Sequence, residues 1–383
     1  MAVLREPYGF VHQDKSPLKE VYGGPSGQVF VECMRVRPAD TASRTVIVFS
    51  HPIGGGAFLP LVTALAAAGR HVIYCNPRYR GNDTALILEK CVLDLGACIA
   101  DLKTRFGYEK VLLGGWSGGG SLSLFYQDQA QNPTITQTPA GDAVDLVGAG
   151  LQPADGVLLL AAHVSRSVTM TEWLDPSILD ESRPFERDVA LAIYDPACPH
   201  QPPYDDAFVA RFRAAQLNRN RRITAWARDQ LAALRASGDP DAERCFVVQG
   251  TMCDVRWTDP TQDRSDRRPG TCYLGDPRIA NDGPVGLARF TTLRSWLSQW
   301  SFDESRANGV LNAARITCPV LVVDNTADLA CTPSHAARLF AAAASADKTL
   351  VRIQGADHYY VERKDLLPQA VGAIGGWMDE RGF

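Results

Sequence analysis

The chain has 383 residues, of which 45% are hydrophobic, 21% charged and 8% aromatic, a composition typical of globular proteins and not of disordered ones. Its formal net charge is −4, so it lacks the basic excess of proteins that bind phosphate backbones, and we expect neither nucleic acid nor a membrane as a partner. A single core rarely exceeds roughly 250–300 residues, which predicts one large domain with a sizeable insertion, or two domains.

The first part of the chain alternates predicted strands and helices. Apolar and β-branched runs predict strands at 30–37, 45–50, 71–75, 111–113 and 156–162. Apolar residues at helical spacing predict helices at 58–68, 86–106 and 121–130. Because near-continuous apolar strands separated by helices form parallel sheets covered on both faces, we expect an α/β fold with a mostly parallel sheet flanked by helices.

This alternation is interrupted after residue 163 and returns at about residue 313. The intervening segment is rich in Pro, Asp, Arg and Trp, with helices predicted at 206–217 and 222–236. An insertion of ~150 residues is too long for a loop, so we interpret 164–312 as a mainly helical cap on a core made of 1–163 and 313–383. In the second part of the core, strands are predicted at 319–323 and 349–353, and helices at 333–344 and 365–378.

Gly115-Trp116-Ser117-Gly118-Gly119 fits the pattern G-x-S-x-G. It directly follows a predicted strand and directly precedes a predicted helix, which is the context that a nucleophile elbow requires. The serine of such an elbow occupies a sharp, strained turn, and side chains at 115 and 119 would clash where strand and helix pass closely. A plain glycine-rich turn is the alternative. A phosphate-binding loop is disfavoured because its lysine is missing.

On this motif the sequence resembles the α/β-hydrolase fold superfamily, over roughly residues 25–163 and 313–383. The resemblance places the catalytic acid after a late strand, at Asp328 in Val320-Leu321-Val322-Val323-Asp324-Asn325-Thr326-Ala327-Asp328. Asp324, nearer the strand end, is the alternative. Asn325 stands where glycine is usual, and we expect it to tolerate the same left-handed backbone.

The resemblance places the catalytic histidine in the loop after the final strand, where this chain has His358. The order Ser, Asp, His along the chain is also the order of this fold. His51, His163 and His335 are interpreted as hydrogen-bonded structural histidines. Asp357 is expected to point away from its neighbour His358 along an extended segment, so we do not assign it as the acid.

The oxyanion hole of this fold needs two backbone donors. We expect one to be the N–H of Gly118, the residue after the nucleophile, and the other the N–H of Ile53 in His51-Pro52-Ile53-Gly54-Gly55-Gly56. Proline stands at position 52, where relatives have glycine, but the donor is the next residue. Trp116 and Tyr359, which adjoin the serine and the histidine, are candidates for the substrate pocket.

Together these residues predict a serine hydrolase that cleaves a carboxylic ester or lactone through an acyl-enzyme, with no metal and no organic cofactor. Tryptophans 173, 226, 257, 296 and 300 in the insertion favour a bulky apolar or aromatic substrate, unless they form the insertion's own core. Carbon–carbon bond hydrolysis, amide hydrolysis, acyl transfer and non-catalytic binding are the alternatives. Dehalogenase and epoxide-hydrolase chemistry in this fold need aspartate at the elbow, and because position 117 is serine, neither is expected. The core loops offer only Arg78 and Arg80 as cations, which favours neutral acyl groups.

The ten cysteines include no C-x-x-C pair, so neither a zinc ribbon nor a thioredoxin-like site is indicated. We expect most of them to be small buried apolar side chains in a reducing compartment, and a disulfide among Cys245, Cys253 and Cys272 stays open. The N-terminal residues lack the basic start and long apolar run of a signal peptide. The longest apolar runs fall short of the roughly 18 residues of a membrane helix, so a cytoplasmic protein is expected.

Overall fold

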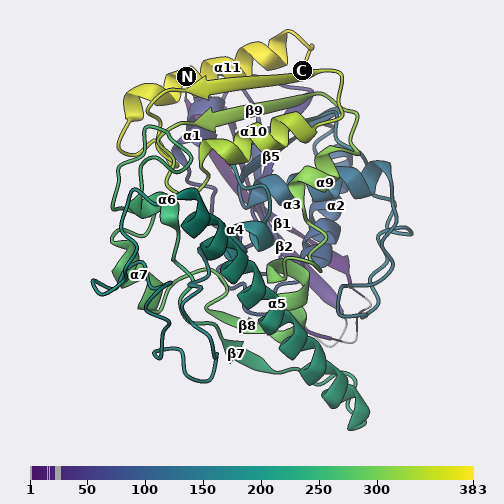
Figure 1. The fold of residues 1–383 in the computed structure, drawn as a ribbon. Helices are drawn as coiled ribbons and strands as arrows, with labels where there is room; N and C mark the ends of the chain where they lie inside the picture. The colour runs from purple at the N-terminus through teal and green to yellow at the C-terminus, as the bar shows by residue number, and fades with distance from the viewer. Residues whose placement is uncertain (1, 15, 17, 22–26) are drawn as a thin grey trace.

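The computed structural model describes residues 2–14, 16, 18–21 and 27–383 and is built around an eight-stranded sheet (Figure 1). The strand order is β1-β2-β4-β3-β5-β6-β9-β10. β1 pairs antiparallel with β2, and β2 pairs antiparallel with β4, whereas all later neighbours are parallel. The strands are β1 (Val3–Gln13), β2 (Gln28–Pro38), β3 (Thr45–Ser50), β4 (Val72–Asn76), β5 (Lys110–Ser117), β6 (Gly156–Ala162), β9 (Val320–Asn325) and β10 (Lys348–Ile353).

Helices cover both faces of the sheet because the parallel strands are apolar on both faces. One face packs against α2 (Leu88–Arg105), α3 (Gly119–Gln131) and α10 (Pro333–Ala342). The other packs against α1 (Pro60–Ala67) and α11 (Leu367–Asp379), which contact each other. The 3-10 turn η2 (Lys364–Leu366) leads into α11. The mostly parallel, helix-flanked sheet confirms the expected fold class, and the chain has the α/β-hydrolase fold.

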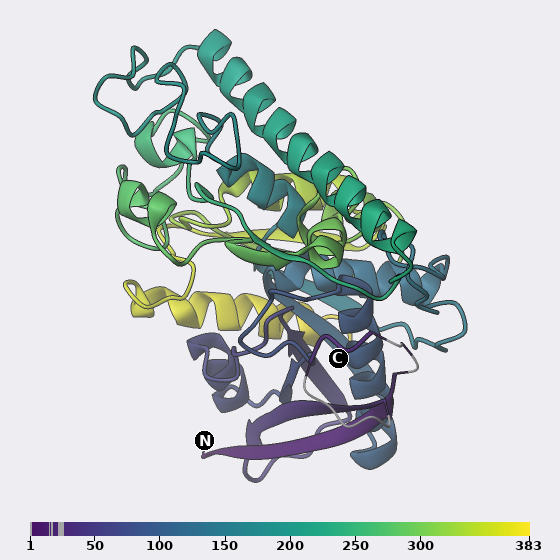
Figure 2. The ribbon, with the colours of Figure 1, turned by 90° about the horizontal axis from the view of Figure 1, so that it is seen from below.

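The segment between β6 and β9 contains short helices, one long helix and a two-stranded sheet. Figure 2 shows the long helix α5 on the side of the molecule opposite the edge strands β1 and β2. The α5 residues Ile223, Ala227 and Leu231 pack in an apolar cluster that also contains Trp296 and Trp300. The elements are α4 (Arg166–Trp173), α5 (Asp206–Ala236), β7 (Cys245–Val247), α6 (Val255–Thr258), α7 (Pro277–Asp282), β8 (Phe290–Thr292), α8 (Leu293–Ser295), the π-helix η1 (Trp296–Trp300) and α9 (Gly309–Ala313).

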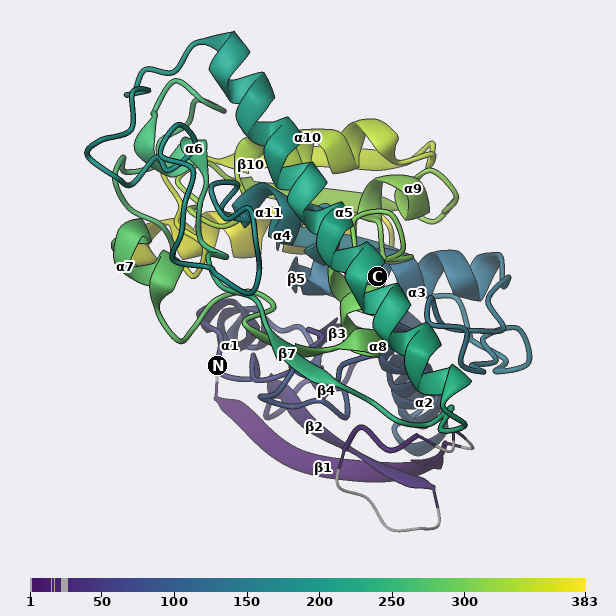
Figure 3. The same cartoon turned by 60° about the horizontal axis from the view of Figure 1, so that its bottom comes forward.

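One sequence expectation is wrong, and one strand of the main sheet was not predicted. The helices predicted at 206–217 and 222–236 are one continuous 31-residue helix, α5, which crosses the molecule in Figure 3. Neither Gly nor Pro interrupts the residues between the two predicted helices, Asn218 to Arg221, and Arg219 and Asn220 are buried there with hydrogen bonds to neighbouring loops. Strand β1 was not predicted, because its partly exposed edge carries charged residues among the apolar ones. In the part of the chain that the structure describes, no helix is long and apolar enough to span a bilayer.

Candidate active site

Ser117 lies at the junction of β5 and α3, at the carboxyl end of the central strands. Its φ of 54° is in the left-handed region, which a residue other than glycine adopts only under strain. A Cβ on Gly115 would lie 2.7 Å from Cα of Gly120, and one on Gly119 would overlap the carbonyl oxygen of Ser50. The flanking glycines therefore permit the tight strand-to-helix turn that holds the serine.

Asp328 and His358 lie side by side although they follow different strands. His358 Nδ1 donates to Asp328 Oδ2 at 2.6 Å. The other carboxylate oxygen, Oδ1, accepts the backbone N–H groups of Ala330 at 2.7 Å and Cys331 at 2.8 Å. Asp328 is fully buried and His358 is 6% exposed. With both oxygens occupied, the carboxylate is fixed in place and holds the imidazole in the tautomer with its proton on Nδ1.

The two other carboxylates considered from the sequence lie in different surroundings. Asp324 Oδ2 accepts from Arg352 Nε at 3.3 Å, and burial raises the pKa of Asp324 to about 6, against the opposing charge of Arg352. Asp357 accepts backbone N–H groups from the turn that follows it, including those of Tyr359 and Arg363. Of these three carboxylates, Asp328 is the one hydrogen-bonded to His358.

The role expected for Asn325 is wrong. The residue is not in the left-handed region but ends strand β9 in regular pairing with Ile353. Its amide instead joins the loops of Asp328 and His358, because Nδ2 donates to the carbonyl oxygen of Asp357 at 2.9 Å and Oδ1 accepts from the Tyr360 hydroxyl at 2.6 Å. An asparagine side chain thus ties the loop of His358 to the end of β9, which glycine could not do.

Ser117, Gly118 and His358 open onto a cavity of about 310 Å³. Among the described residues, no hydrogen bond joins Ser117 Oγ to the His358 ring, a bond that often forms or tightens only with substrate bound. The predicted pocket residues Trp116 and Tyr359 both line the cavity. The lining residues are His51, Ile53, Gly54, Gly55, Gly56, Leu59, Asp83, Trp116, Ser117, Gly118, His163, Arg166, Thr169, Trp173, Tyr273, Leu287, Ala330, His358 and Tyr359.

The loop predicted to complete the oxyanion hole lies in the cavity wall. The N–H of Ile53 donates to Nδ1 of His51 over a long 3.4 Å. Nε2 of the same ring lies 2.9 Å from the position that a Cβ on Gly118 would occupy. Burial, aided by the charge of Arg166, lowers the pKa of His51 to about 3. The ring is therefore neutral, carries its proton on Nε2, and presents an N–H beside Gly118.

The other two histidines near strand ends make structural hydrogen bonds. His163 Nδ1 bonds the hydroxyl of Thr169 at 3.0 Å, and His335 Nδ1 accepts the N–H of Val164 at 3.2 Å. Burial lowers the pKa of His163, and it lowers that of His335 to about 4. His163 also lines the cavity. These hydrogen bonds link the segment after β6 to α4 and to α10, which is a structural role.

The cation that faces the cavity is Arg166, and not Arg78 or Arg80 as the core loops suggested. Arg78 is buried in ion pairs with Asp94 and Asp14, and Arg80 pairs with Glu32; neither lines the cavity. Arg166 does line it. The position of Arg166, four residues after the end of β6, could have indicated this. Side chains that follow the carboxyl ends of parallel strands converge on one edge of the sheet.

The tryptophans of the insertion divide between the cavity and the insertion's core. Trp173 lines the cavity and packs against Trp257, with ring centroids 4.9 Å apart. Trp296 and Trp300 are fully buried in the cluster beneath α5, and Trp226 packs against it. Most of these indoles therefore form core, and the aromatic wall of the cavity comes from Trp116, Trp173, Tyr273 and Tyr359.

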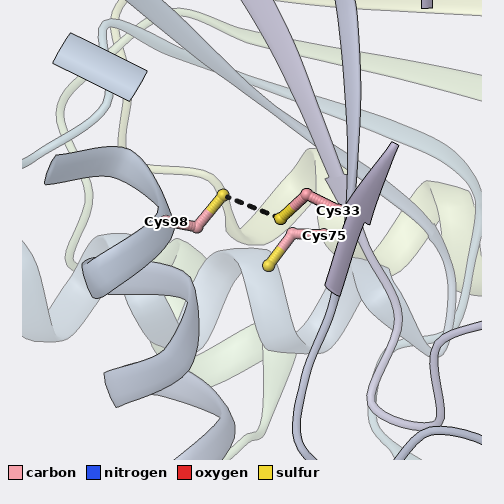
Figure 4. Close-up of side chains that lie close together, drawn as sticks. All are labelled: Cys33, Cys75 and Cys98. Atoms are coloured by element: carbon pink, nitrogen blue, oxygen red, sulfur yellow. Dashed lines mark hydrogen bonds between the residues drawn. The ribbon is translucent and has the colours of Figure 1, made fainter. Parts of the chain in front are cut away.

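Three of the cysteines form a cluster that their spacing did not reveal. Cys33 and Cys75 are paired across β2 and β4, and Cys98 of α2 faces them with its sulfur 3.9 Å from that of Cys33 (Figure 4). These three are fully enclosed by apolar side chains. Cys331 lies with Asp328 and His358. All ten cysteines are free, and Cys245 is the exposed one, so the possible disulfide among Cys245, Cys253 and Cys272 is not present.

Comparison with known proteins gives likeness at the level of structure alone. No protein-family model matches the chain, and no curated protein sequence matches it. Among similar solved structures, a monoacylglycerol lipase from Paleococcus ferrophilus is 16% identical, with 99% of this chain and 98% of that one covered and a TM-score of 0.44. An esterase domain from Rhodothermus marinus is 14% identical over 97% and 98%, with a TM-score of 0.45. Est1E from Butyrivibrio proteoclasticus is 12% identical over 92% and 94%, also with a TM-score of 0.45. The strand order and the elbow of this chain itself define its fold class.

Proposed function

We propose that the protein is a serine hydrolase that cleaves a carboxylic ester or lactone, with Ser117 as nucleophile, His358 as general base and Asp328 as the orienting acid. The observation that carries the proposal is the buried Asp328–His358 hydrogen bond of 2.6 Å at a cavity that also contains a serine on a strained elbow. A nucleophile, a base and a group that orients the base are the three parts that this chemistry needs.

In the proposed mechanism, His358 Nε2 accepts the proton of Ser117 as Oγ attacks the substrate carbonyl. The N–H of Gly118 stabilises the oxyanion, an interaction typically worth ~3–4 kcal/mol per donor. The N–H of Ile53 is the proposed second donor and must exchange its long bond to His51 for one to the substrate. His358 then returns the proton to the leaving alcohol, and water hydrolyses the acyl-enzyme by the same steps in reverse.

We propose that residues 164–312 act as a cap over this site. Arg166, Trp173, Tyr273 and Leu287 of the segment line the cavity together with residues of the core. The indole N–H of Trp257 also donates to the carbonyl oxygen of Leu329, next to Asp328, at 2.9 Å. The segment therefore contacts both the cavity and the loop of the catalytic acid, as a cap that shapes the substrate pocket would.

The cavity supports a substrate with an apolar or aromatic part. Its aromatic wall, formed by Trp116, Trp173, Tyr273 and Tyr359, provides stacking surfaces. Its volume of about 310 Å³ is at the low end for ligand pockets, so the enclosed part of the substrate is compact. We therefore propose a compact aromatic or apolar group, in place of the bulky one that the tryptophan content suggested.

The purified protein is expected to hydrolyse short p-nitrophenyl esters, because a small acyl group fits the cavity and the nitrophenolate leaves easily. A panel of p-nitrophenyl esters, aliphatic esters and lactones, followed by product release, measures this. The same panel includes vinylogous diketo acids, for which we expect little turnover. A kcat/KM for a diketo acid above that of every ester and lactone would contradict the proposal.

Carbon–carbon bond hydrolysis is the second candidate, and one observation favours it. This reaction uses the same triad but must also hold a polar, often anionic substrate, which calls for a fixed cation at the site. Arg166 is such a cation. The two candidates share every step at Ser117, so the ranking of kcat/KM across the panel decides between them.

Exhaustive chelation is expected to leave activity unchanged, since the proposed steps use only side chains and backbone amides. Asp328, Cys331 and His358 could together hold a metal ion, but such an ion would occupy the proposed acid and base. The measurement is ester turnover before and after dialysis against a strong chelator. A loss of turnover that added zinc restores would show that the reaction depends on a metal.

A further inference from the structure

Arg166 is a buried cation that points toward the reacting end of the cavity. It is the first residue of α4 and its side chain is 6% exposed. Its Nη1 lies 3.5 Å from the position that a Cβ on Gly118 would occupy, and Gly118 follows the proposed nucleophile. In the described part of the chain, Arg166 is the only lysine or arginine that lines the cavity.

The contacts of Arg166 leave part of its guanidinium without a partner. Nη2 donates to Asp83 Oδ2 at 2.6 Å, and the group stacks on Trp300, 4.3 Å from the ring centroid. Nε is buried without a hydrogen-bond partner in the described residues. A guanidinium has five N–H donors, and leaving buried donors of a charged group unpaired is unfavourable. One monodentate carboxylate therefore does not complete the group.

The neighbours of Arg166 hold it in place and add no second positive charge. Asp83 is held in turn, because its backbone carbonyl oxygen accepts a hydrogen bond from the Gln299 side-chain amide at 2.8 Å. Burial lowers the pKa of His51 and of His163, so both flanking rings are neutral. Arg166 is thus a single, rigid, preorganised cation beside the proposed oxyanion site, where a planar guanidinium can bind a carboxylate in a fixed orientation.

We propose that the substrate carries a carboxylate, which Arg166 binds close to the scissile carbonyl. The identity of the bond that is cleaved rests on the proposed function above, whereas the charge preference does not depend on it. We assign a carboxylate and not a phosphate because a lone guanidinium already paired with Asp83 provides too little positive charge for a phosphate dianion. The carboxylate can belong to the acyl part or to the alcohol part of an ester, and the test separates the two.

The test compares charged substrates with neutral partners of equal size. The first pair is monomethyl glutarate and the same ester with its carboxylic acid converted to a primary amide. The second pair is 3-acetoxypropionate and its primary amide, which places the charge on the alcohol side. We expect kcat/KM for the acid to exceed that for the amide by ~10-fold or more in at least one pair. An acid-to-amide ratio of one or less in both pairs overturns the proposal.

Variants assign the preference to Arg166. In Arg166→Met, and in Arg166→Met combined with Asp83→Asn, which avoids leaving Asp83 unpaired, the acid-to-amide ratio is expected to fall to about one. The matched control is Arg80→Met, which removes an exposed arginine that does not line the cavity and should keep the wild-type ratio. A high ratio that survives both Arg166 variants would overturn the assignment.

Binding separates failure of this inference from failure of the proposed function. With Ser117→Ala, the chemistry is removed while Arg166 and Trp300 remain, so tryptophan fluorescence can report binding of the same four compounds. Saturable binding of an acid that is at least ~10-fold tighter than that of its amide, and lost in Arg166→Met, supports the inference even if no ester is turned over. Absence of turnover would then count against the ester-hydrolase proposal alone. Equal binding of acid and amide, or no binding of either, would overturn the inference.

Discussion

Replacing Ser117 by alanine is expected to remove turnover of every ester and lactone that the wild-type protein accepts, with a loss of ~10⁵-fold or more in kcat. The hydroxyl is the atom that forms the acyl-enzyme, and the substitution deletes it. Alanine at this position keeps a side chain in the left-handed conformation that Ser117 already adopts, so the fold should persist. Initial rates on the best ester of the panel, together with a thermal melt of each variant, measure both effects.

The matched control for Ser117 is Ser123→Ala. Ser123 is a buried serine of α3 whose hydroxyl has no hydrogen-bond partner in the described residues, and it does not line the cavity. This variant should retain activity close to that of the wild type. If the Ser117 variant instead turned over esters at the wild-type rate while correctly folded, another nucleophile would have to be sought, and Cys331 beside His358 would be the first candidate.

Asp328→Asn is expected to lower kcat by ~10⁴-fold with little change in overall structure. The carboxylate accepts the Nδ1 proton of His358 and the N–H groups of Ala330 and Cys331. An amide at this position can present an N–H to His358 Nδ1, which forces the proton onto Nε2, where the base must be free. The charge that stabilises the imidazolium is lost as well.

Asp324→Asn is the control for this prediction. Asp324 is a buried carboxylate close to Asp328 along the chain, but its contact is with Arg352, and burial raises its pKa to about 6. Because the hydrogen bond to His358 comes from Asp328 and not from Asp324, an amide at position 324 should have far less effect on kcat. The comparison is made on one ester at one pH on the alkaline side of neutrality. A larger loss for Asp324 than for Asp328 would show that the wrong carboxylate has been assigned.

Much of the sheet could be predicted because its strands carry strong local signals. The runs at 45–50 and 156–162 are continuous apolar strands, and the structure places β3 and β6 at those same residues. The first edge strand was missed because an edge is half exposed and carries charged residues, so periodicity alone does not distinguish it from a loop. The division of α5 into two helices had a similar origin, since residues 218–221 lack an apolar stripe and are held by polar contacts from distant loops.

The triad residues could be proposed because each follows a recognisable strand, whereas most of the cavity wall could not. Arg166, Asp83 and Tyr273 come from three separate segments, and no local pattern indicates that they meet at the cavity. The role of Asn325 was also misjudged, because its function is a contact with Asp357 and Tyr360, more than thirty residues further along the chain. Local sequence reports backbone preference, and such contacts between loops emerge only from the folded chain.

In the proposed mechanism, Ser117 attacks the substrate and becomes acylated. The most direct measurement is mass spectrometry of the protein after reaction with a serine-directed fluorophosphonate, and after rapid acid quench during turnover of a p-nitrophenyl ester. The proposal requires a single covalent adduct that maps to Ser117 in both experiments and is absent from Ser117→Ala. An adduct that maps to Cys331 or to any other residue, with the Ser117 variant still active, would contradict it.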